Sequence, residues 1–397
     1  MSNSPPVIEL LGPWLQNNGD GLNLWSVAER FKESATVAVS STLGLEKLPE
    51  RPRLAWVKWM PDLASLGKAA RSGSPQKVAR VCQDGVALAL APRRMLHARR
   101  IAPGREIAAL LDCSGFAYGD VWPTHRVERR AAYYRKLKAQ GTAVILLPQA
   151  FGPFERPEMR HCCRELFEQC ELIYPRDAIS RQHLVELGVG DKAPAVTPDI
   201  THLLKGTPPV DPGAWKRRVC IVPNARMTDK TSPERGDRYF GFILKAIDHV
   251  RARDLEPVLL VHERNDLPLA QCIRDAVTVP PAIVDEDALA SKGILGGCYA
   301  VVGSRYHALI SALSQGVPAI GTSWSHKYEE LFGDYGCCQY LLSPEGDAAQ
   351  LEATLGRMLD PAVHDTLAAH LAVHAQQQKA KVEEMWSRIE WLIFSRH

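Results

Sequence analysis

The chain has 397 residues and carries 48 Lys and Arg against 45 Asp and Glu, a formal net charge of +3. Hydrophobic residues make up 46% and charged residues 23%, a composition that excludes a disordered chain or a coiled coil. The length predicts two domains, and the balanced charge argues against a nucleic-acid partner held by one broad basic surface.

Cysteine usage and hydropathy indicate the compartment. The ten cysteines include the adjacent pairs Cys162-Cys163 and Cys337-Cys338, but no CxxC motif and no zinc-type spacing. No apolar run approaches roughly 18 residues, and Met1 to Pro6 does not begin a signal peptide. We therefore predict a cytoplasmic protein with reduced thiols and no metal.

In the first half, short apolar runs alternate with longer amphipathic stretches, which is typical of an α/β fold with a parallel sheet. The predicted strands are Val7–Leu11, Thr36–Val39, Leu54–Val57, Val86–Leu90, Ile107–Leu111, Ala143–Leu147 and Leu172–Tyr174. The predicted helices are Leu22–Lys32, His125–Gln140, Pro157–Gln169 and Ala178–Leu187.

A stretch rich in proline and glycine, Lys205 to Gly213, predicts the domain boundary. We expect an N-terminal domain over 1–205, a linker over 206–217, a C-terminal domain over 218–360 and a helical tail over 361–397. The predicted strands of the second domain are Val219–Val222, Pro257–Val261, Ala282–Val284, Ala300–Val302 and Ala319–Gly321. Its predicted helices are Tyr239–Arg253, Leu267–Val277, Asp287–Leu295, Ala308–Ser314 and Asp347–Leu359.

The tail ends in the aromatic-rich segment Met385 to Phe394, which needs a surface to cover it. We predict that it packs back on the first domain. A contact between two copies of the chain is the alternative.

Ligands of open parallel sheets bind beyond the carboxyl ends of the strands, so the residues there are the candidates for a site. In the first half, Asn18-Gly19-Asp20 reads as a turn in which Gly and Asn permit positive φ and Asp20 caps a helix. Gln149 follows a strand and could contact a sugar hydroxyl or only a backbone amide. Three further residues of this half follow a predicted strand or a proline: Arg176, Asp177 and Asp199. Asp177 is a candidate helix cap, whereas Arg176 could face either a cleft or a neighbouring acid.

The second half carries a stronger pattern. A buried strand runs into Ser304, which we expect to cap a helix whose first turn holds Arg305 and His307. Cationic groups at the positive end of a helix are disfavoured unless an anion is bound there. We therefore predict a phosphate or carboxylate site at this helix start, with a core histidine as the alternative for His307.

Three more cations follow neighbouring strands and could add charge to the same opening: Arg226, His262 and Lys327. For Lys327, a solvated surface charge is an equal alternative.

These residues resemble the polysaccharide pyruvyltransferase family. The motifs that carry the resemblance are Asn18-Gly19-Asp20, Leu147-Pro-Gln-Ala-Phe-Gly-Pro153, Pro175-Arg-Asp-Ala-Ile-Ser180, Thr197-Pro-Asp199, Gly303-Ser-Arg-Tyr-His-Ala-Leu309 and Ala312-Leu-Ser-Gln-Gly-Val-Pro-Ala-Ile-Gly321 followed by Lys327. The segment Asp112-Cys-Ser-Gly115 departs from the more glycine-rich turn of that family.

The resemblance implies two Rossmann-like domains facing across a cleft, as in GT-B glycosyltransferases. It also implies transfer of pyruvate from phosphoenolpyruvate to two hydroxyls of a sugar in a bacterial surface polysaccharide or its precursor. The product would be a cyclic ketal, phosphate would be released, and no cofactor besides the donor would be needed. Arg305 and His307 would contact phosphoenolpyruvate, with His307 as the first candidate for an acid or base. Asp20 or Asp199 could instead deprotonate the acceptor.

Two other functions fit parts of the pattern. A nucleotide-sugar glycosyltransferase would use the same helix-terminus site, but the sequence offers no ribose-binding carboxylate after it until Glu329-Glu330. A non-enzymatic glycan-binding protein would use some of the nine tryptophans, although ionisable groups at several strand ends argue against it.

The basic stretches Pro92–Arg100 and Arg126–Lys138 could contact anionic lipid on the inner face of the membrane or an acidic glycan. A solvated helix face is the alternative for both. Lipid linkage of the sugar acceptor and a homo-oligomer are further expectations.

Overall fold

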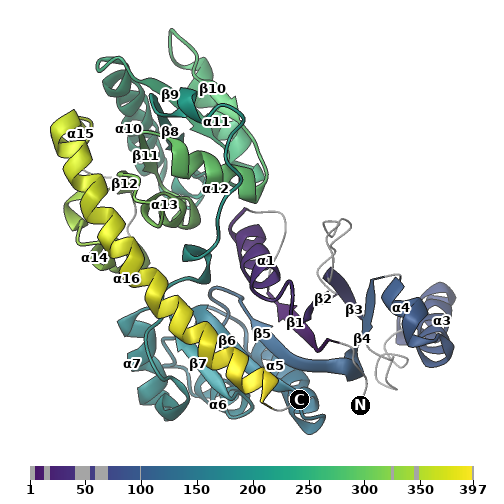
Figure 1. Cartoon of the computed structure of the whole chain (residues 1–397). Coiled ribbons are helices and arrows are strands. Elements are labelled where there is room, and N and C mark those ends of the chain that lie inside the picture. The colour runs from purple at the N-terminus through teal and green to yellow at the C-terminus, as the bar shows by residue number, and fades with distance from the viewer. Residues whose placement is uncertain are drawn as a thin grey trace. The chain divides into compact units, whose positions relative to one another are not determined.

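The computed structural model describes residues 5–12, 18–40, 54–58, 70–98, 100–322, 326–343 and 348–395. The chain divides into two compact units. Unit 1 comprises residues 1–14, 27–197 and 388–397, and unit 2 comprises 15–26 and 198–387. The expected linker, 206–217, lies inside unit 2. Each unit is a parallel sheet with helices, which confirms the predicted α/β class (Figure 1).

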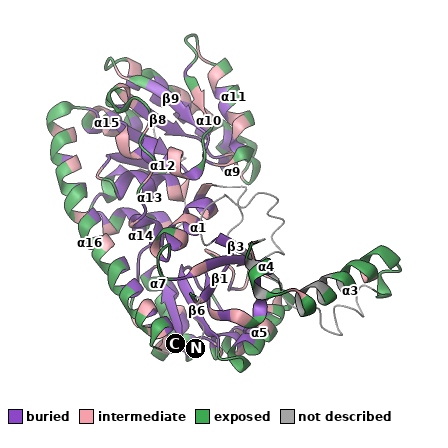
Figure 2. Cartoon of the chain, turned by 45° about the vertical axis from the view of Figure 1, so that its right-hand side comes forward, coloured by how far each residue is buried: buried purple, intermediate pink, exposed green. Residues whose placement is uncertain are grey.

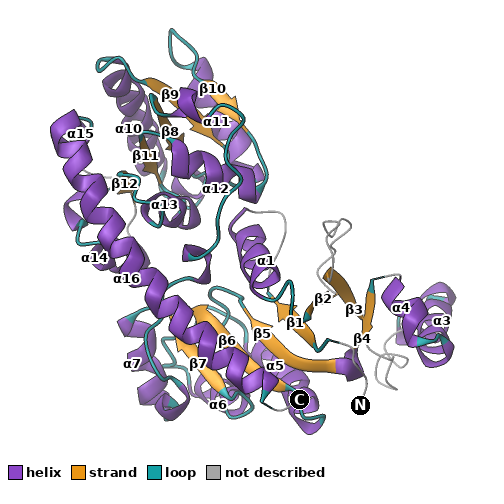
Figure 3. Ribbon diagram, viewed as in Figure 1, coloured by secondary structure: helices purple, strands orange, loops and turns teal. Residues whose placement is uncertain are grey.

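Unit 1 contains a seven-stranded sheet in the order β4-β3-β2-β1-β5-β6-β7, with every pairing parallel (Figure 3). The strands are β1 (Val7–Leu11), β2 (Thr36–Ser40), β3 (Leu54–Lys58), β4 (Ile101–Pro103), β5 (Ile107–Asp112), β6 (Ala143–Gln149) and β7 (Leu172–Pro175). Six of them contain or extend a predicted strand, because buried Val, Ile, Leu and Ala runs are characteristic of parallel sheets. The short β4 was not predicted.

The helices in this part of the chain are α1 (Asn18–Arg30), α3 (Pro75–Leu90), α4 (Arg93–Ala98), α5 (Thr124–Ala139), α6 (Pro157–Phe167) and α7 (Ala178–Leu187). Asp177 caps α7 by accepting a hydrogen bond from the Ser180 amide at 2.6 Å, as the sequence predicts. The predicted strand Val86–Leu90 is wrong, because these residues form the last turns of α3. Alternation of valine or leucine with alanine mimics a strand over five residues, but Ala and Leu also favour a helix.

Unit 2 contains a six-stranded parallel sheet in the order β10-β9-β8-β11-β12-β13. Its strands are β8 (Arg218–Val222), β9 (Glu256–Leu260), β10 (Ala282–Val284), β11 (Ala300–Gly303), β12 (Ala319–Thr322) and β13 (Leu341–Leu342). Its helices are α8 (Pro212–Trp215), α9 (Arg226–Asp229), α10 (Pro233–Arg251), α11 (Leu267–Asp275), α12 (Ala288–Gly297), α13 (Tyr306–Leu313), α14 (His326–Asp334) and α15 (Ala348–Met358).

Strands β6, β7, β11 and β12 are buried along their whole length, whereas the edge strand β10 is not (Figure 2). In unit 2 the core continues from the sheet into α10, α13 and the C-terminal helix α16 (Pro361–Phe394), which contributes Leu367, Leu371 and Ala375. Each unit therefore has a hydrophobic core of its own, with a sheet at its centre.

The last residues of α16 pack on unit 1, as the sequence predicts. Arg30 of α1 forms an ion pair with Glu390, with its Nε 2.6 Å from the carboxylate, and the rings of Phe31 and Phe394 are in contact. Trp391 nevertheless keeps 70% of its surface exposed. The described helices include none that is both long and apolar enough to cross a membrane.

Candidate functional site

The order of strands in unit 2 places a topological switch point between β8 and β11. The chain builds the sheet outward from β8 to β10 and then returns to place β11 on the other side of β8. Ligands of doubly wound sheets bind where the strand order reverses in this way, outside the carboxyl ends. The residues that follow β8, β9 and β11 therefore form the candidate site.

Ser304 connects β11 to its neighbours. Its carbonyl accepts hydrogen bonds from the Asn224 side-chain amide at 2.8 Å and from the Tyr328 hydroxyl at 3.0 Å. Its hydroxyl contacts Thr322 and donates to Tyr239 at 3.0 Å. The prediction that Ser304 caps α13 is wrong, because Arg305 occupies the N-cap position and no side chain caps the helix there. The hydroxyl is instead used in a buried network between strand ends.

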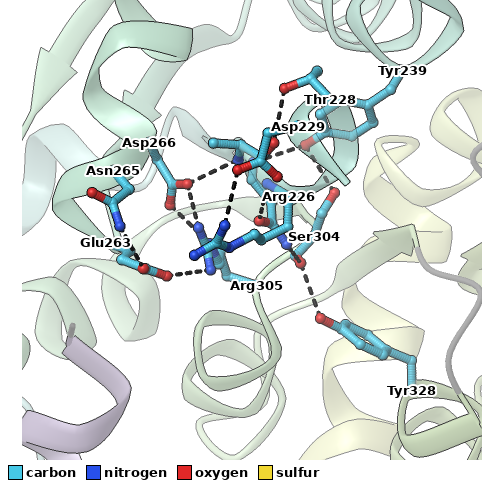
Figure 4. A network of polar contacts seen from close by, with 12 residues as sticks. Arg226, Thr228, Asp229, Tyr239, Glu263, Asn265, Asp266, Ser304, Arg305 and Tyr328 are labelled. Atoms are coloured by element: carbon cyan, nitrogen blue, oxygen red, sulfur yellow. Dashed lines mark hydrogen bonds and ion pairs between the residues drawn. The ribbon is translucent and has the colours of Figure 1, made fainter. Parts of the chain in front are cut away.

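Arg305 is held by two carboxylates (Figure 4). Its Nε donates to Asp266 Oδ2 at 2.8 Å, a second nitrogen contacts the same carboxylate, and Nη1 forms an ion pair with Glu263. The side chain of Asp266 is fully buried, whereas that of Glu263 is 19% exposed. Asp266 is thus the fixed partner of the guanidinium, and Glu263 is the partner that faces solvent.

His307 lies in the first turn of α13, where its Nε2 is 3.4 Å from Asp199 Oδ2. The other oxygen of Asp199 accepts from the backbone amide and the hydroxyl of Thr201, at 2.9 and 2.6 Å. Burial alone would raise the pKa of Asp199, but the contacts with His307 and Thr201 outweigh it and hold this pKa well below its usual range. Asp199 is therefore an ionised partner for the imidazole.

Gly19 approaches the other ring nitrogen of His307. A Cβ atom placed on Gly19 would lie 2.2 Å from His307 Nδ1, far inside van der Waals contact. Gly19 belongs to the first turn of α1, so the expected turn with positive φ is wrong. The motif needs glycine here because a side chain would displace the imidazole. Asn18 fixes the start of the helix, since its side chain donates to Glu286 and Ser291, both at 3.1 Å.

Three buried basic side chains surround this pair. Desolvation lowers the pKa of His262 to about 3, with the positive charges of His307 and Arg305 acting in the same direction. Desolvation likewise lowers the pKa of His202 to about 4. It lowers that of Lys292 to about 7, although Asp199 opposes the shift. His262 is therefore neutral at pH 7, and the expectation that it adds a positive charge is wrong.

The remaining predicted cations of unit 2 lie at the edge of this network. Lys327 lies over the rings of Tyr306 and Tyr328, 5.2 Å from each centroid, which places it beside the start of α13. Arg226 is half exposed, and its Nη1 is 2.9 Å from Asp229 (Figure 4).

The structure brings most of the predicted site residues into one unit. Those in unit 2 are Asn18, Asp20, Asp199, Arg226, His262, Ser304, Arg305, His307 and Lys327. Gln149 and Arg176 belong to unit 1. Gln149 is buried at the end of β6, where its amide donates to the Asp112 carbonyl at 3.1 Å. Arg176 lies beside Asp177, with Nε 3.8 Å from the carboxylate.

Sequence reasoning missed four residues of this network: Asn224, Glu263, Asp266 and Lys292. The first three follow β8 and β9, so their position after strands was a usable signal. Lys292 interrupts the apolar segment of α12, and a lone charge in such a segment marks either a surface position or a buried functional one.

The arrangement combines an anion-binding group with a proton carrier. Arg305 provides a planar guanidinium at the start of a helix, and His307 provides an imidazole two residues further along with an ionised carboxylate behind it. Such a pair can bind a phosphate or carboxylate and move a proton beside it.

Comparison with solved structures supports the fold class. The chain is similar to a putative UDP-N-acetylglucosamine 2-epimerase from Listeria monocytogenes, with a TM-score of 0.54 and 14% identity over 97% of both chains. It is also similar to MnaA from S. aureus in complex with UDP (TM-score 0.56, 12% identity, 98% and 97% covered). A third similar structure is Alr3699/HepE from Anabaena with UDP and glucose (0.54, 11%, 97% and 99%). At these identities the likeness shows the fold alone, a GT-B-type pair of Rossmann-like α/β units.

A sequence model of the polysaccharide pyruvyl transferases matches residues 14–326, and the chain belongs to this family. Comparison with curated proteins finds no match. The matched range includes both the Asn18-Gly19-Asp20 motif and the Arg305/His307 pair.

Replacement of Gly19 by alanine tests the packing around the imidazole. We expect Gly19→Ala to leave the protein folded, because alanine favours a helix, but to displace His307 and lower turnover by roughly 10²-fold or more. The measurement is kcat together with thermal unfolding. Gly241→Ala is the matched control, since a Cβ at this site meets no atom within 4 Å. Normal turnover of Gly19→Ala would show that the imidazole position does not matter.

The buried Lys292 predicts a pH dependence of stability. Its pKa is about 7 in the folded protein against an ordinary value of 10.5, so the unfolded chain binds more protons between these values. The free energy of unfolding should therefore rise with pH across this window through this group, and the rise should be smaller in Lys292→Met. Urea unfolding at pH 7 and at pH 9.5 measures it. The exposed Lys245→Met should keep the wild-type rise, and an unchanged rise in Lys292→Met would contradict the assignment.

Proposed function

We propose that the protein transfers pyruvate from phosphoenolpyruvate to two hydroxyls of one sugar in a bacterial surface polysaccharide or its precursor. The product is a cyclic pyruvyl ketal, and inorganic phosphate is released. Family membership supports a pyruvyl transfer onto polysaccharide. The donor and the ketal are what the resemblance to this family implies, and a guanidinium beside an imidazole is compatible with them.

One observation carries the proposal: a histidine backed by an ionised carboxylate lies two residues after an arginine at the start of α13. Phosphoenolpyruvate is a small dianion or trianion whose reaction needs proton movement next to bound negative charge. The start of α13 offers both functions within three residues, with Arg305 at the N-cap and His307 in the first turn.

The reaction can be written with all atoms balanced. The methylene carbon of phosphoenolpyruvate gains a proton, and the oxygen of one sugar hydroxyl attacks the adjacent carbon. The second hydroxyl then attacks the same carbon as the bond to the phosphate oxygen breaks. The protons of the two hydroxyls end on the new methyl group and on the departing phosphate.

We assign the proton transfer to His307 and a positioning role to Asp199. A carboxylate with a lowered pKa is a weak base, and both of its oxygens face partners, Thr201 on one side and His307 on the other. It therefore suits orientation of the imidazole and stabilisation of the imidazolium better than abstraction of a proton from the sugar.

Arg305 is the proposed ligand of the donor, assisted by Lys327 and Arg226. Its guanidinium is already paired with Asp266 and Glu263, and we propose that an incoming phosphate or carboxylate takes the place of one of these carboxylates. Glu263 is the exchangeable partner because it is partly exposed, whereas Asp266 is buried. The anion would then bind an arginine whose orientation Asp266 maintains.

We assign Gln149 and Arg176 to sugar binding because Gln149 is the last residue of β6 and Arg176 directly follows β7, and Asp20 is an alternative base for an acceptor hydroxyl.

Phosphate release from phosphoenolpyruvate in the presence of a panel of sugar acceptors tests the function. We expect saturable release that requires a sugar and falls by roughly 10²- to 10⁴-fold in His307→Gln. His249→Gln is the matched control, because His249 also pairs with an acid, Glu352, at 3.3 Å. Mass spectrometry of the product distinguishes a ketal from simple hydrolysis. Binding of nucleotide sugars without binding of phosphoenolpyruvate would instead favour a glycosyltransferase.

Glu263→Gln tests how Arg305 takes up the donor. Removal of this negative charge leaves the guanidinium with one carboxylate. We therefore expect phosphoenolpyruvate to bind more tightly, with a Kd lower by about tenfold, because one competing charge is lost. Calorimetric titration measures the affinity. Glu256→Gln is the control, since Glu256 pairs with Arg218 at 2.9 Å on the surface. Weaker binding in Glu263→Gln would mean that Glu263 supports the donor rather than competing with it.

A further inference from the structure

Helices α3 and α4 expose large apolar side chains to solvent. Val86 is 58% exposed, Leu90 77% and Met95 48%. Figure 2 shows α3 extending away from the sheet of unit 1, with its described residues coloured mostly as exposed. Apolar side chains clustered at one place on a surface mark a site of interaction.

The exposed apolar residues of α3 lie on one face of the helix. Ala79, Cys82, Val86 and Leu90 follow one another at spacings of three and four residues, and all four are exposed. Met95 extends this apolar character into α4. These side chains form an exposed apolar stripe along one side of α3.

The same segment is strongly basic. Residues 70–100 contain seven Lys or Arg and one Asp, a net charge of +6. Because the whole chain carries +3, the rest of it has a net charge of −3. The positive charge of the protein is thus concentrated around its exposed apolar helix, where Lys77, Arg80 and Arg94 are themselves exposed.

Charge complementarity decides between the surfaces that could cover this face. A second copy of the same segment would bring two groups of +6 together, and like charges oppose such a contact. A nucleic acid would match the charge but leave Val86 and Leu90 in water. An anionic bilayer satisfies both features, because its headgroups attract Lys and Arg while its acyl region accepts apolar side chains.

We propose that α3 and α4 form a membrane-docking surface that binds the protein to an anionic lipid bilayer. Val86, Leu90 and Met95 enter the boundary between headgroups and acyl chains, and Arg80 and Arg94 contact the lipid phosphates. This surface is independent of the transfer chemistry proposed for unit 2. It would bring the enzyme to acceptors that are carried on lipid.

Cosedimentation of the full-length protein with vesicles tests the proposal. The vesicles contain phosphatidylcholine alone or mixed with phosphatidylglycerol. We expect the protein to bind the mixed vesicles much more strongly than vesicles of phosphatidylcholine alone. Binding to the mixed vesicles should weaken as salt is added. The paired substitution Arg80→Gln/Arg94→Gln should weaken it roughly 25-fold, since each basic residue near the surface contributes about fivefold.

The paired substitution Val86→Ser/Leu90→Ser tests the apolar part and should weaken vesicle binding about tenfold or more. The controls are Val210→Ser/Val373→Ser, exposed valines outside α3 and α4, and Arg253→Gln/Arg274→Gln, surface arginines outside both basic stretches. Phosphate release with a water-soluble acceptor should be unchanged in all of these variants. Equal binding to both kinds of vesicle, or equal losses in the control variants, would overturn the proposal. Sedimentation velocity gives the oligomeric state of the same variants. A wild-type dimer that Val86→Ser/Leu90→Ser converts to a monomer would also overturn the proposal, because this face would then be a contact between copies.

Discussion

The buried carboxylate of Asp266 joins the segments that follow three strands of unit 2. It follows β9, accepts the backbone amide of Ala225 after β8 at 2.9 Å, and binds the guanidinium of Arg305 after β11. A carboxylate without exposure is costly unless its oxygens are paired, so these contacts must form together. The geometry of the site at the switch point depends on this one side chain.

Pairing with Asp266 gives Arg305 a defined orientation, but it also occupies part of the guanidinium that a ligand would need. Two carboxylates surround one guanidinium, so the negative charge beside Arg305 opposes the approach of an anion. The network holds the arginine in place, and the proposed donor would have to compete with Glu263 for the exposed edge of the guanidinium. Burial lowers the pKa of His262, and the nearby charges of His307 and Arg305 act in the same direction, so this imidazole stays neutral.

The strands were accessible from sequence because buried parallel strands consist of short apolar runs, and most of the predicted runs lie in β-strands. Val86–Leu90 failed because an Ala/Leu alternation satisfies both helix and strand patterns. Ser304 failed as a cap for another reason: its hydroxyl contacts Tyr239, 65 residues away, and a local pattern cannot reveal that partner. Arg305 and His307 could be predicted because they follow a strand and begin a helix. Their carboxylate partners, Asp199, Glu263 and Asp266, are distant in sequence, so a local pattern cannot show these pairings.

The position of His307 depends on the absence of a side chain at Gly19. Asp199 fixes one ring nitrogen by attraction, whereas Gly19 limits the other side by contact with the backbone of α1. Because α1 begins in unit 2 and ends in unit 1, the helix that confines the proposed proton carrier also leads into the first sheet. A change in the direction of the first turn of α1 would therefore alter the space available to the imidazole.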